Sequence, residues 1–212
     1  MLSKHTMFTK SAAYFGGLKK RGRLFVISAS SGTGKTTLAK KLMKEDRSLV
    51  QSVSVTTRPP RPKETQGKDY FFVSEKKFQA MRRNNGFLEW ANVFGRFYGT
   101  PKKQVEDYLR IGRDVLLLID VQGAKQVKKT KPDAVFIFLT PPSKEELKRR
   151  LIRRGTESPK EIDRRYRVAT SELKELNELR LCDYRIVNRE LSVAYQVLKA
   201  IILAERTATG KK

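Results

Sequence analysis

The ten residues from Ser28 to Thr37, Ser-Ala-Ser-Ser-Gly-Thr-Gly-Lys-Thr-Thr, have the composition and spacing of a loop that binds phosphate groups. They follow a short apolar run and precede a stretch with helical periodicity, which is the context that such a loop requires. Gly32 and Gly34 allow successive backbone N–H groups to turn toward phosphate oxygens, and the helix N-terminus adds partial positive charge. We predict that Lys35 reaches the terminal phosphates of a nucleoside triphosphate and that the Thr36 hydroxyl ligates Mg²⁺.

The first position of this loop departs from the usual pattern, which begins with glycine. The chain has Ala29 there. Alanine is compatible with the loop if the backbone at this position does not adopt a positive φ angle. The residues that we predict to bind the triphosphate are Ala29, Ser30, Ser31, Gly32, Thr33, Gly34, Lys35, Thr36 and Thr37.

Strands and helices must position this loop, and the chain alternates between the two types of pattern. Like the run Arg23–Ala29 before the loop, the runs Asp114–Ile119 and Ala134–Leu139 are apolar almost throughout, which is typical of strands buried on both faces of a parallel sheet. The other predicted elements are a strand at Asp183–Val187 and helices at about Lys35–Glu45, from Ser143 onward, from Pro159 to about Arg180, and at Leu191–Glu205. This alternation predicts an α/β fold, a three-layer sandwich with a central parallel sheet.

Residues 52–100 interrupt the alternation. Three prolines, Pro59, Pro60 and Pro62, are followed by four glycines at positions 67, 86, 95 and 99, with aromatic residues between them. Proline and glycine at such density are typical of turns and short irregular elements. We therefore predict a smaller lobe inserted into the α/β core.

Composition excludes several classes of function. No apolar run approaches the roughly 20 residues of a membrane-spanning helix, so we expect no membrane association. Cys182 is the only cysteine, which rules out an internal disulfide and favours a reducing, cytoplasmic location. The only histidine, His5, lies in the N-terminal tail, so histidine acid–base catalysis and a His/Cys metal site are poor hypotheses.

The formal net charge is +24, from 46 Lys and Arg residues against 22 Asp and Glu residues. This balance favours polyanionic partners, which include nucleotides, nucleic acids and acidic membrane surfaces. A nucleic-acid-binding protein is therefore one alternative. The sequence has no recognition-helix, zinc or stacking-aromatic signature, so nucleic-acid binding is expected to be nonspecific if it occurs.

Several separated motifs occur in an order that resembles the guanylate kinase family, over roughly residues 23–205. They are the phosphate loop (a P-loop), Ser52–Arg61, Gly67–Val73, Phe87–Trp90, Phe97–Thr100, Asp120–Gly123, Arg153–Glu157 and Ile186–Asn188. The resemblance implies Mg²⁺-dependent transfer of the γ-phosphoryl group of ATP to GMP or dGMP. It also implies a domain at 21–207, with its core at 21–51 and 101–207, a GMP-binding lobe at about 52–100 and an arginine-bearing lid at about 148–170, flanked by a basic extension (1–20) and a tail (208–212).

The residue types of the inserted lobe suit GMP. Arg58 and Arg61 supply planar donor forks for a dianionic phosphate, and the hydroxyls of Tyr70 and Tyr98 can donate to the same oxygens. Guanine presents N1–H and N2–H donors on one edge, and the carboxylate of Glu89 can accept from both. Adenine has an unprotonated N1 at that place, which a carboxylate would repel. The resemblance implies these roles, and it adds Ser54, Gly99, Thr100 and Asp120 to the GMP-binding set.

By motif position, the resemblance makes Arg150, Arg154 and Arg165 the lid arginines. Such guanidinium groups stabilise the charge on a moving phosphoryl group. Together with Lys35 and Arg61 they form the predicted catalytic set. The GMP phosphate oxygen is already ionised at neutral pH, so in-line transfer requires no general base.

Two further predictions follow from the resemblance. Asn188 is expected to border the adenine of ATP. Asp120, at the end of a strand, is expected to contribute to the metal site with Thr36, through a water molecule, or to help recognise guanine. The family usually has Asp-x-Asp at this place, and here Leu118 replaces the first aspartate.

Two alternatives to this activity remain at the level of sequence. A related P-loop kinase could act on another phosphorylated acceptor, such as a ribose bisphosphate, although Ser54 and Glu89 favour guanine. A guanylate-kinase-like interaction domain without catalysis is the other, and Leu118 favours it. Such domains typically have a degraded P-loop, whereas Lys35 and Thr36 are present here.

Overall fold

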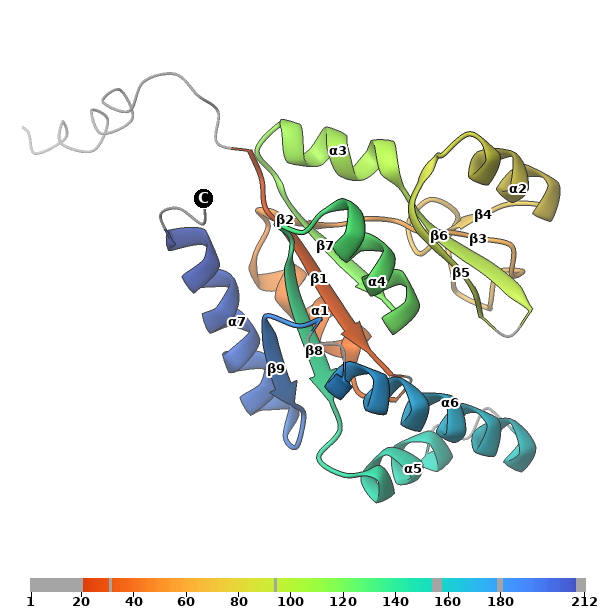
Figure 1. Ribbon diagram of the computed structural model, residues 1–212, viewed down its shortest axis with the longest axis vertical. Helices are drawn as coiled ribbons and strands as arrows, with labels where there is room; N and C mark the ends of the chain where they lie inside the picture. The colour runs from red at the N-terminus through yellow and green to blue at the C-terminus, as the bar shows by residue number, and fades with distance from the viewer. Residues whose placement is uncertain (1–20, 31, 94, 154–157, 179–180, 209–212) are drawn as a thin grey trace, which may run out of the picture.

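The computed structural model describes residues 21–30, 32–93, 95–153, 158–178 and 181–208 (Figure 1). The predicted basic extension at 1–20, most of the predicted tail, and the predicted site residues Ser31 and Arg154 lie outside the described residues. No helix in the described part is long and apolar enough to cross a membrane.

A five-stranded parallel sheet forms the centre of the larger part of the molecule. Its strand order is β2-β7-β1-β8-β9, and each neighbouring pair is parallel. The strands are β1 (Leu24–Ala29), β2 (Leu49–Gln51), β7 (Asp114–Ile119), β8 (Val135–Thr140) and β9 (Tyr184–Val187). The prediction of a central parallel sheet from continuous apolar runs is confirmed, and β7 has the predicted bounds.

Helices cover both faces of this sheet and make three layers. Alternate residues of β1 point to opposite faces, so Phe25 and Ile27 pack with α1 and α7, whereas Leu24 and Val26 pack with α3 and α4. The helices of these two layers are α1 (Lys35–Glu45), α3 (Lys102–Arg110), α4 (Val121–Thr130) and α7 (Leu191–Thr207). The predicted three-layer α/β fold is confirmed, although the sequence had not predicted α3 and α4 as separate helices.

A second, smaller sheet lies beside this core (Figure 1). Its order is β4-β3-β6-β5, with β5 at one edge. The strands are β3 (Val55–Thr56), β4 (Phe71–Phe72), β5 (Phe87–Val93) and β6 (Arg96–Pro101), and α2 (Glu75–Arg83) packs on them. The ring of Phe78, from α2, stacks on Phe87 and Phe97 with centroids 4.5 and 5.3 Å apart, respectively. This aromatic stack is a small core of the segment that the sequence predicted as an inserted lobe.

Two more helices, α5 (Lys144–Arg153) and α6 (Pro159–Glu178), pack against each other beyond the end of β8. Leu147 and Leu151 of α5 and Ala169 of α6 form their buried contact. The Ser143 hydroxyl accepts a hydrogen bond from the backbone N–H of Glu146 at 3.2 Å, which is the predicted N-cap of α5.

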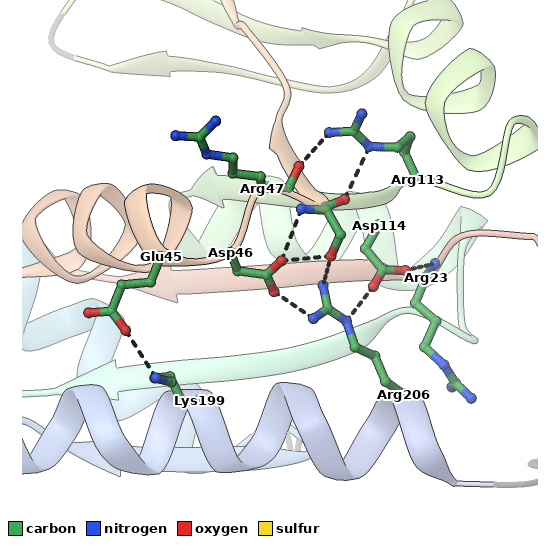
Figure 2. A network of polar contacts seen from close by, with 9 residues as sticks. Arg23, Glu45, Asp46, Arg47, Arg113, Asp114, Lys199 and Arg206 are labelled. Atoms are coloured by element: carbon green, nitrogen blue, oxygen red, sulfur yellow. Dashed lines mark hydrogen bonds and ion pairs between the residues drawn. The ribbon is translucent and has the colours of Figure 1, made fainter. Parts of the chain in front are cut away.

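The end of α7 is tied to the core by an arginine that bridges two aspartates (Figure 2). Arg206 donates to Asp114, at the start of β7, at 2.6 Å and to Asp46, at the end of α1, at 2.5 Å. It also donates to the Ser48 hydroxyl at 3.0 Å, and the backbone N–H of Arg23 donates to the other oxygen of Asp114. Three segments far apart in the sequence therefore meet on one side chain.

We expect replacement of this arginine to lower stability without changing the site at the opposite end of β7. Arg206→Ala removes charged hydrogen bonds from the partly buried Asp46 and Asp114, so the free energy of unfolding should fall by about 1–3 kcal/mol. Urea unfolding measures the change. The matched control is Arg110→Ala, which breaks an exposed pair with Asp107 and should have no measurable effect. Equal effects of the two variants would contradict the structural role of Arg206.

Candidate nucleotide-binding site

The P-loop connects β1 to α1 with two glycines in the left-handed region. Gly32 has φ 87° and Gly34 has φ 94°, and both values favour glycine. Gly34 is the N-cap of α1, which has no capping side chain and no acidic residue in its first turn. The positive end of the helix macrodipole therefore lacks a negatively charged partner from its own first turn, and the loop suits an anion.

Ala29 explains why the loop does not need its usual first glycine. It is the last residue of β1 and pairs with Leu139 of β8, so its backbone is extended. The condition stated from the sequence, that this position does not require a positive φ, is met. Alanine is therefore compatible with the loop.

Asn188, which follows β9, is packed against the P-loop. Its side-chain N–H donates to the carbonyl oxygen of Thr33 at 2.7 Å, and the residue is 3% exposed. A Cβ atom on Gly34 would come within 2.7 Å of the same nitrogen, a second reason for glycine there. The amide oxygen of Asn188 is buried and has no hydrogen-bond partner among the described residues, which is rare for a buried polar atom.

A cavity of about 710 Å³ extends from the P-loop to the smaller sheet. Its volume lies within the usual range of small-molecule sites. Lys35 and Asp120 line it from the core, Arg58 and Glu89 from the smaller lobe, and Arg165 from α6. The cavity therefore joins the phosphate loop to the lobe that the sequence predicted to bind a second substrate.

Glu89 is a buried carboxylate in this cavity, 5% exposed. Thr100, opposite it on β6, donates a hydrogen bond from its hydroxyl to one carboxylate oxygen at 2.5 Å. Burial raises the pKa of Glu89 to about 7, and nearby Asp120 adds to the rise, whereas the Thr100 hydrogen bond opposes it. The carboxylate thus lacks the solvation or the partners that would restore its ordinary pKa.

Lys35 lies among three carboxylates at the base of the cavity. Its Nζ donates to the carbonyl oxygen of Ile119 at 2.7 Å. Burial lowers the pKa of Lys35, and the charges of Asp120, Glu172 and Glu89 oppose that change. Burial also raises the pKa of Glu172, on α6, to about 7. A lysine in such a place is a charge for which a phosphate group would be a strong partner.

Arg58 is fixed at the opposite side of the cavity by Glu64. Its two terminal nitrogens donate to the two Glu64 oxygens at 2.9 Å each, and its Nε donates to the Tyr98 hydroxyl at 3.2 Å. The guanidinium also lies 5.4 Å from the centre of the Tyr70 ring. These contacts hold the planar donor fork in one orientation beside two hydroxyl groups.

Comparison with known proteins decides the family. The guanylate kinase family model matches residues 21–205. The chain belongs to the guanylate kinase family. It is 49% identical over 189 residues to a guanylate kinase of Dechloromonas aromatica, covering 89% of this chain and 92% of that protein. It is also 49% identical to a guanylate kinase of Thermus thermophilus, covering 90% and 85%, respectively.

A solved structure supports the same assignment. The chain resembles the crystal structure of guanylate kinase from Anaplasma phagocytophilum with a TM-score of 0.73 and 36% sequence identity, covering 91% of this chain and 90% of that chain. The resemblance stated from the sequence motifs is therefore confirmed at the level of family and fold.

Most of the predicted site residues of this family member line the cavity described above. They are Ala29, Ser30, Gly32, Thr33, Gly34, Lys35, Thr36, Thr37, Ser54, Arg58, Arg61, Tyr70, Glu89, Tyr98, Asp120 and Arg165. The structure thus brings the predicted ATP-binding and GMP-binding sets to one place. Leu118, the departure from the family pattern, lines the same cavity two residues before Asp120.

Four predicted residues lie beside the cavity rather than on its wall. Thr100 contacts it through Glu89, and Gly99 lies next to Thr100 in β6, where a Cβ atom would come within 2.8 Å of the Phe87 ring. Asn188 contacts the P-loop through the Thr33 carbonyl oxygen. Arg150 donates to Glu146 at 2.8 Å and to the carbonyl oxygen of Asn188 at 2.9 Å, so its guanidinium is engaged outside the cavity.

Sequence reasoning missed several residues on the cavity wall. Glu161, Arg164 and Glu172 come from α6, and Asn92 and Arg96 from the β5–β6 hairpin. Glu172 could have been found by spacing, because Arg165, Ala169 and Glu172 recur at the i, i+4, i+7 positions of one helix face. Arg96 carries no such signal, because its place depends on the hairpin.

The raised pKa of Glu89 predicts how stability changes with pH. Its folded pKa of about 7 lies above its ordinary value of 4.5. Between those two values the folded protein binds more protons than the unfolded chain, so the free energy of unfolding falls as pH rises through this window. The penalty at pH 8 is on the order of 3 kcal/mol at most.

We therefore expect Glu89→Gln to raise stability at pH 8 by about 1–3 kcal/mol while changing it little near pH 5. The glutamine oxygen can still accept from Thr100. Urea unfolding of the ligand-free protein at both pH values measures the difference. Glu75→Gln, the same change at an exposed residue of α2, is the matched control. A Glu89→Gln effect that is identical at pH 5 and pH 8 would contradict the raised pKa.

Proposed function

We propose a residue-level account of how this member of the guanylate kinase family transfers a phosphoryl group from ATP to GMP. The observation that carries it is the shared cavity, in which the P-loop faces the buried Glu89 and the fixed guanidinium of Arg58. A phosphate loop alone indicates only a nucleoside triphosphate. Here the P-loop shares its cavity with the Glu89 carboxylate, which suits the edge of a base, and with the Arg58 guanidinium, which suits a second phosphate. This combination supports a nucleotide as the acceptor.

The donor side binds ATP. The P-loop amides and the N-terminus of α1 bind its phosphates, and Lys35 exchanges its bond to the Ile119 carbonyl for the terminal phosphates. The unpartnered oxygen of Asn188 accepts from the exocyclic amino group of adenine. Guanine has a carbonyl at the equivalent place, so this acceptor favours ATP as the donor.

The acceptor side binds GMP through both of its ends. The ionised Glu89 accepts from N1–H and N2–H of guanine, and these two donors replace the water that its burial removes. Arg58, Arg61, Tyr70 and Tyr98 bind the phosphate, and the Arg58 fork exchanges its bonds to Glu64 for phosphate oxygens. Because GMP and its 2′-deoxy form share the base and the phosphate, dGMP fits the same contacts.

The family reaction requires a divalent metal, and the residues present suit Mg²⁺. Thr36 offers a hydroxyl and Asp120 a carboxylate on the same cavity, and both are oxygen ligands of the type that Mg²⁺ prefers. Among the described residues no group of three His, Cys, Asp or Glu side chains could bind a metal by itself. This donor set fits an ion bound mainly by substrate phosphates and waters. When bound, Mg²⁺ supplies charge neutralisation for the phosphates of ATP.

Transfer then rests on positioning and electrostatics. The cavity places an ionised GMP oxygen opposite the γ-phosphorus, Lys35 and Arg61 offset the charge of the reacting groups, and Arg165 approaches from α6. Arg150 and Arg154 act in the same way if α5 and α6 close over the cavity. No side chain needs to remove a proton, since the attacking oxygen carries none.

The single cysteine and the bacterial relatives support a cytoplasmic location.

The test is coupled ADP release with ATP, Mg²⁺ and a panel of GMP, dGMP, IMP and AMP. We expect turnover with GMP and dGMP, weaker turnover with IMP, which lacks the N2–H donors, and almost none with AMP. Glu89→Gln should lower kcat/KM for GMP by about 10- to 100-fold and reduce the preference for GMP over IMP. The KM for ATP should remain within about twofold.

Glu75→Gln, on the same lobe, should behave as the parent enzyme. Turnover with a different phosphorylated acceptor, or an unchanged GMP preference in Glu89→Gln, would overturn the guanine assignment. Binding of GMP without turnover in the parent enzyme would favour a non-catalytic domain.

A further inference from the structure

Helix α4 connects the core to the edge of the smaller sheet beside Glu89. It begins directly after β7, where Asp120 caps it by accepting from the backbone N–H of Gly123 at 2.8 Å. Its next turn lies against β5, the edge strand that carries Glu89. Gly123 and Gln126 of α4 both take part in this contact.

Gln126 bonds to both polar groups of one residue of the edge strand. Its side-chain oxygen accepts from the backbone N–H of Trp90 at 3.2 Å, and its side-chain nitrogen donates to the Trp90 carbonyl at 2.7 Å. The carboxamide thus pairs with β5 as a neighbouring strand would. Because Trp90 follows Glu89 directly, this pair fixes the backbone that carries the carboxylate.

Gly123 contacts the carboxylate itself. A Cβ atom at this position would lie 2.5 Å from the second oxygen of Glu89 and 3.1 Å from its carboxyl carbon. The φ angle of Gly123 is not positive, so its backbone does not require glycine. Glycine is also a poorer helix former than alanine. The space that the Glu89 carboxylate occupies therefore accounts for the missing side chain.

These contacts leave little freedom for Glu89. One of its oxygens is bonded to Thr100 and the other lies against the backbone of α4. If Gly123 carried a methyl group, the flexible end of Glu89 would be the part that moves, because the Ile119 Cβ on the other side is 3.3 Å away and belongs to the core. A substitution at Gly123 thus displaces a carboxylate rather than unfolding a helix.

We propose that Gly123 and Gln126 are positioning residues for guanine specificity. Gly123 provides the space in which the Glu89 carboxylate stands, and Gln126 fixes the strand behind it. The inference rests on the proposed function, in which Glu89 accepts from the guanine edge. Neither residue touches the base, and both act through Glu89.

The test is Gly123→Ala, measured for GMP, IMP and ATP. The KM for GMP should rise about 10-fold or more and the preference for GMP over IMP should fall, while the KM for ATP remains within about twofold. Gln126→Ala should change the same two quantities by about 3- to 10-fold. Lys129→Ala, an exposed change on the same helix, is the matched control and should have no effect. A purely structural role of these residues would not move the GMP-to-IMP ratio.

A rescue experiment separates displacement of Glu89 from general damage. Glu89→Asp alone shortens the side chain and should weaken GMP binding. In the Gly123→Ala background the shorter acid fits beside the added methyl group, so the double variant should bind GMP at least about fivefold better than Gly123→Ala alone. Glu89→Asp is thus expected to weaken GMP binding in the parent chain and to strengthen it in Gly123→Ala. If the losses from the two substitutions simply add, the steric account is wrong.

Glu89→Gln, measured alongside, separates a failure of the guanine assignment from a failure of the positioning role. If Glu89→Gln leaves the GMP-to-IMP preference unchanged, the guanine assignment of the proposed function fails. If Glu89→Gln changes that preference but Gly123→Ala and Gln126→Ala behave like Lys129→Ala, the positioning inference alone fails. Should Gly123→Ala not fold, as judged by circular dichroism, the ratio in Gln126→Ala decides.

Discussion

The parallel pairing of β1 with β7 is the constraint on which the site depends. Its register, with Ser28 opposite Ile119, brings the P-loop at the end of one strand beside the cap of α4 at the end of the other. The bond from Lys35 to the Ile119 carbonyl crosses this junction. Since α4 begins there and packs against β5, the same register also places the smaller lobe. An error of one residue between the two strands would separate the phosphate loop from the Glu89 carboxylate.

The charged groups of the site are buried without enough partners within the protein to offset their desolvation. Burial raises the pKa values of Glu89 and Glu172 and lowers that of Lys35, although the three groups share one cavity. Opposite charges this close offset only part of the desolvation. In the proposed function phosphate and guanine supply these partners, so substrates bind to the groups whose burial destabilises the cavity. By contrast, the Arg206 bridge at the other end of β7 is fully paired and contributes to stability alone (Figure 2).

The sequence predicted the parts of the fold that local patterns determine. Continuous apolar runs gave β1 and β7 almost residue by residue, and the Gly-Thr-Gly-Lys-Thr spacing located the phosphate loop. It did not predict what depends on packing between distant segments. Gly123 belongs to a recognised motif, but its steric reason exists only once β5 lies against α4. Glu172 is one of many charged residues on α6, and only the fold turns it toward Lys35. For Arg150, motif position predicted a place in the site. It could not predict that the guanidinium donates to the Asn188 carbonyl oxygen.

The carboxylates around Lys35 give a physical reason for leucine, in place of the usual aspartate, at position 118. It lines the cavity two residues before Asp120 and packs in part against the core cluster that contains β1 and α1. Glu89, Asp120 and Glu172 already face a single lysine. An aspartate at position 118 would add a fourth carboxylate at the same end of the sheet, and like charges at short range disfavour one another's ionised forms. In the proposed function Glu89 is ionised when it accepts from both donors of guanine, so an apolar residue at position 118 limits the repulsion that opposes this ionisation.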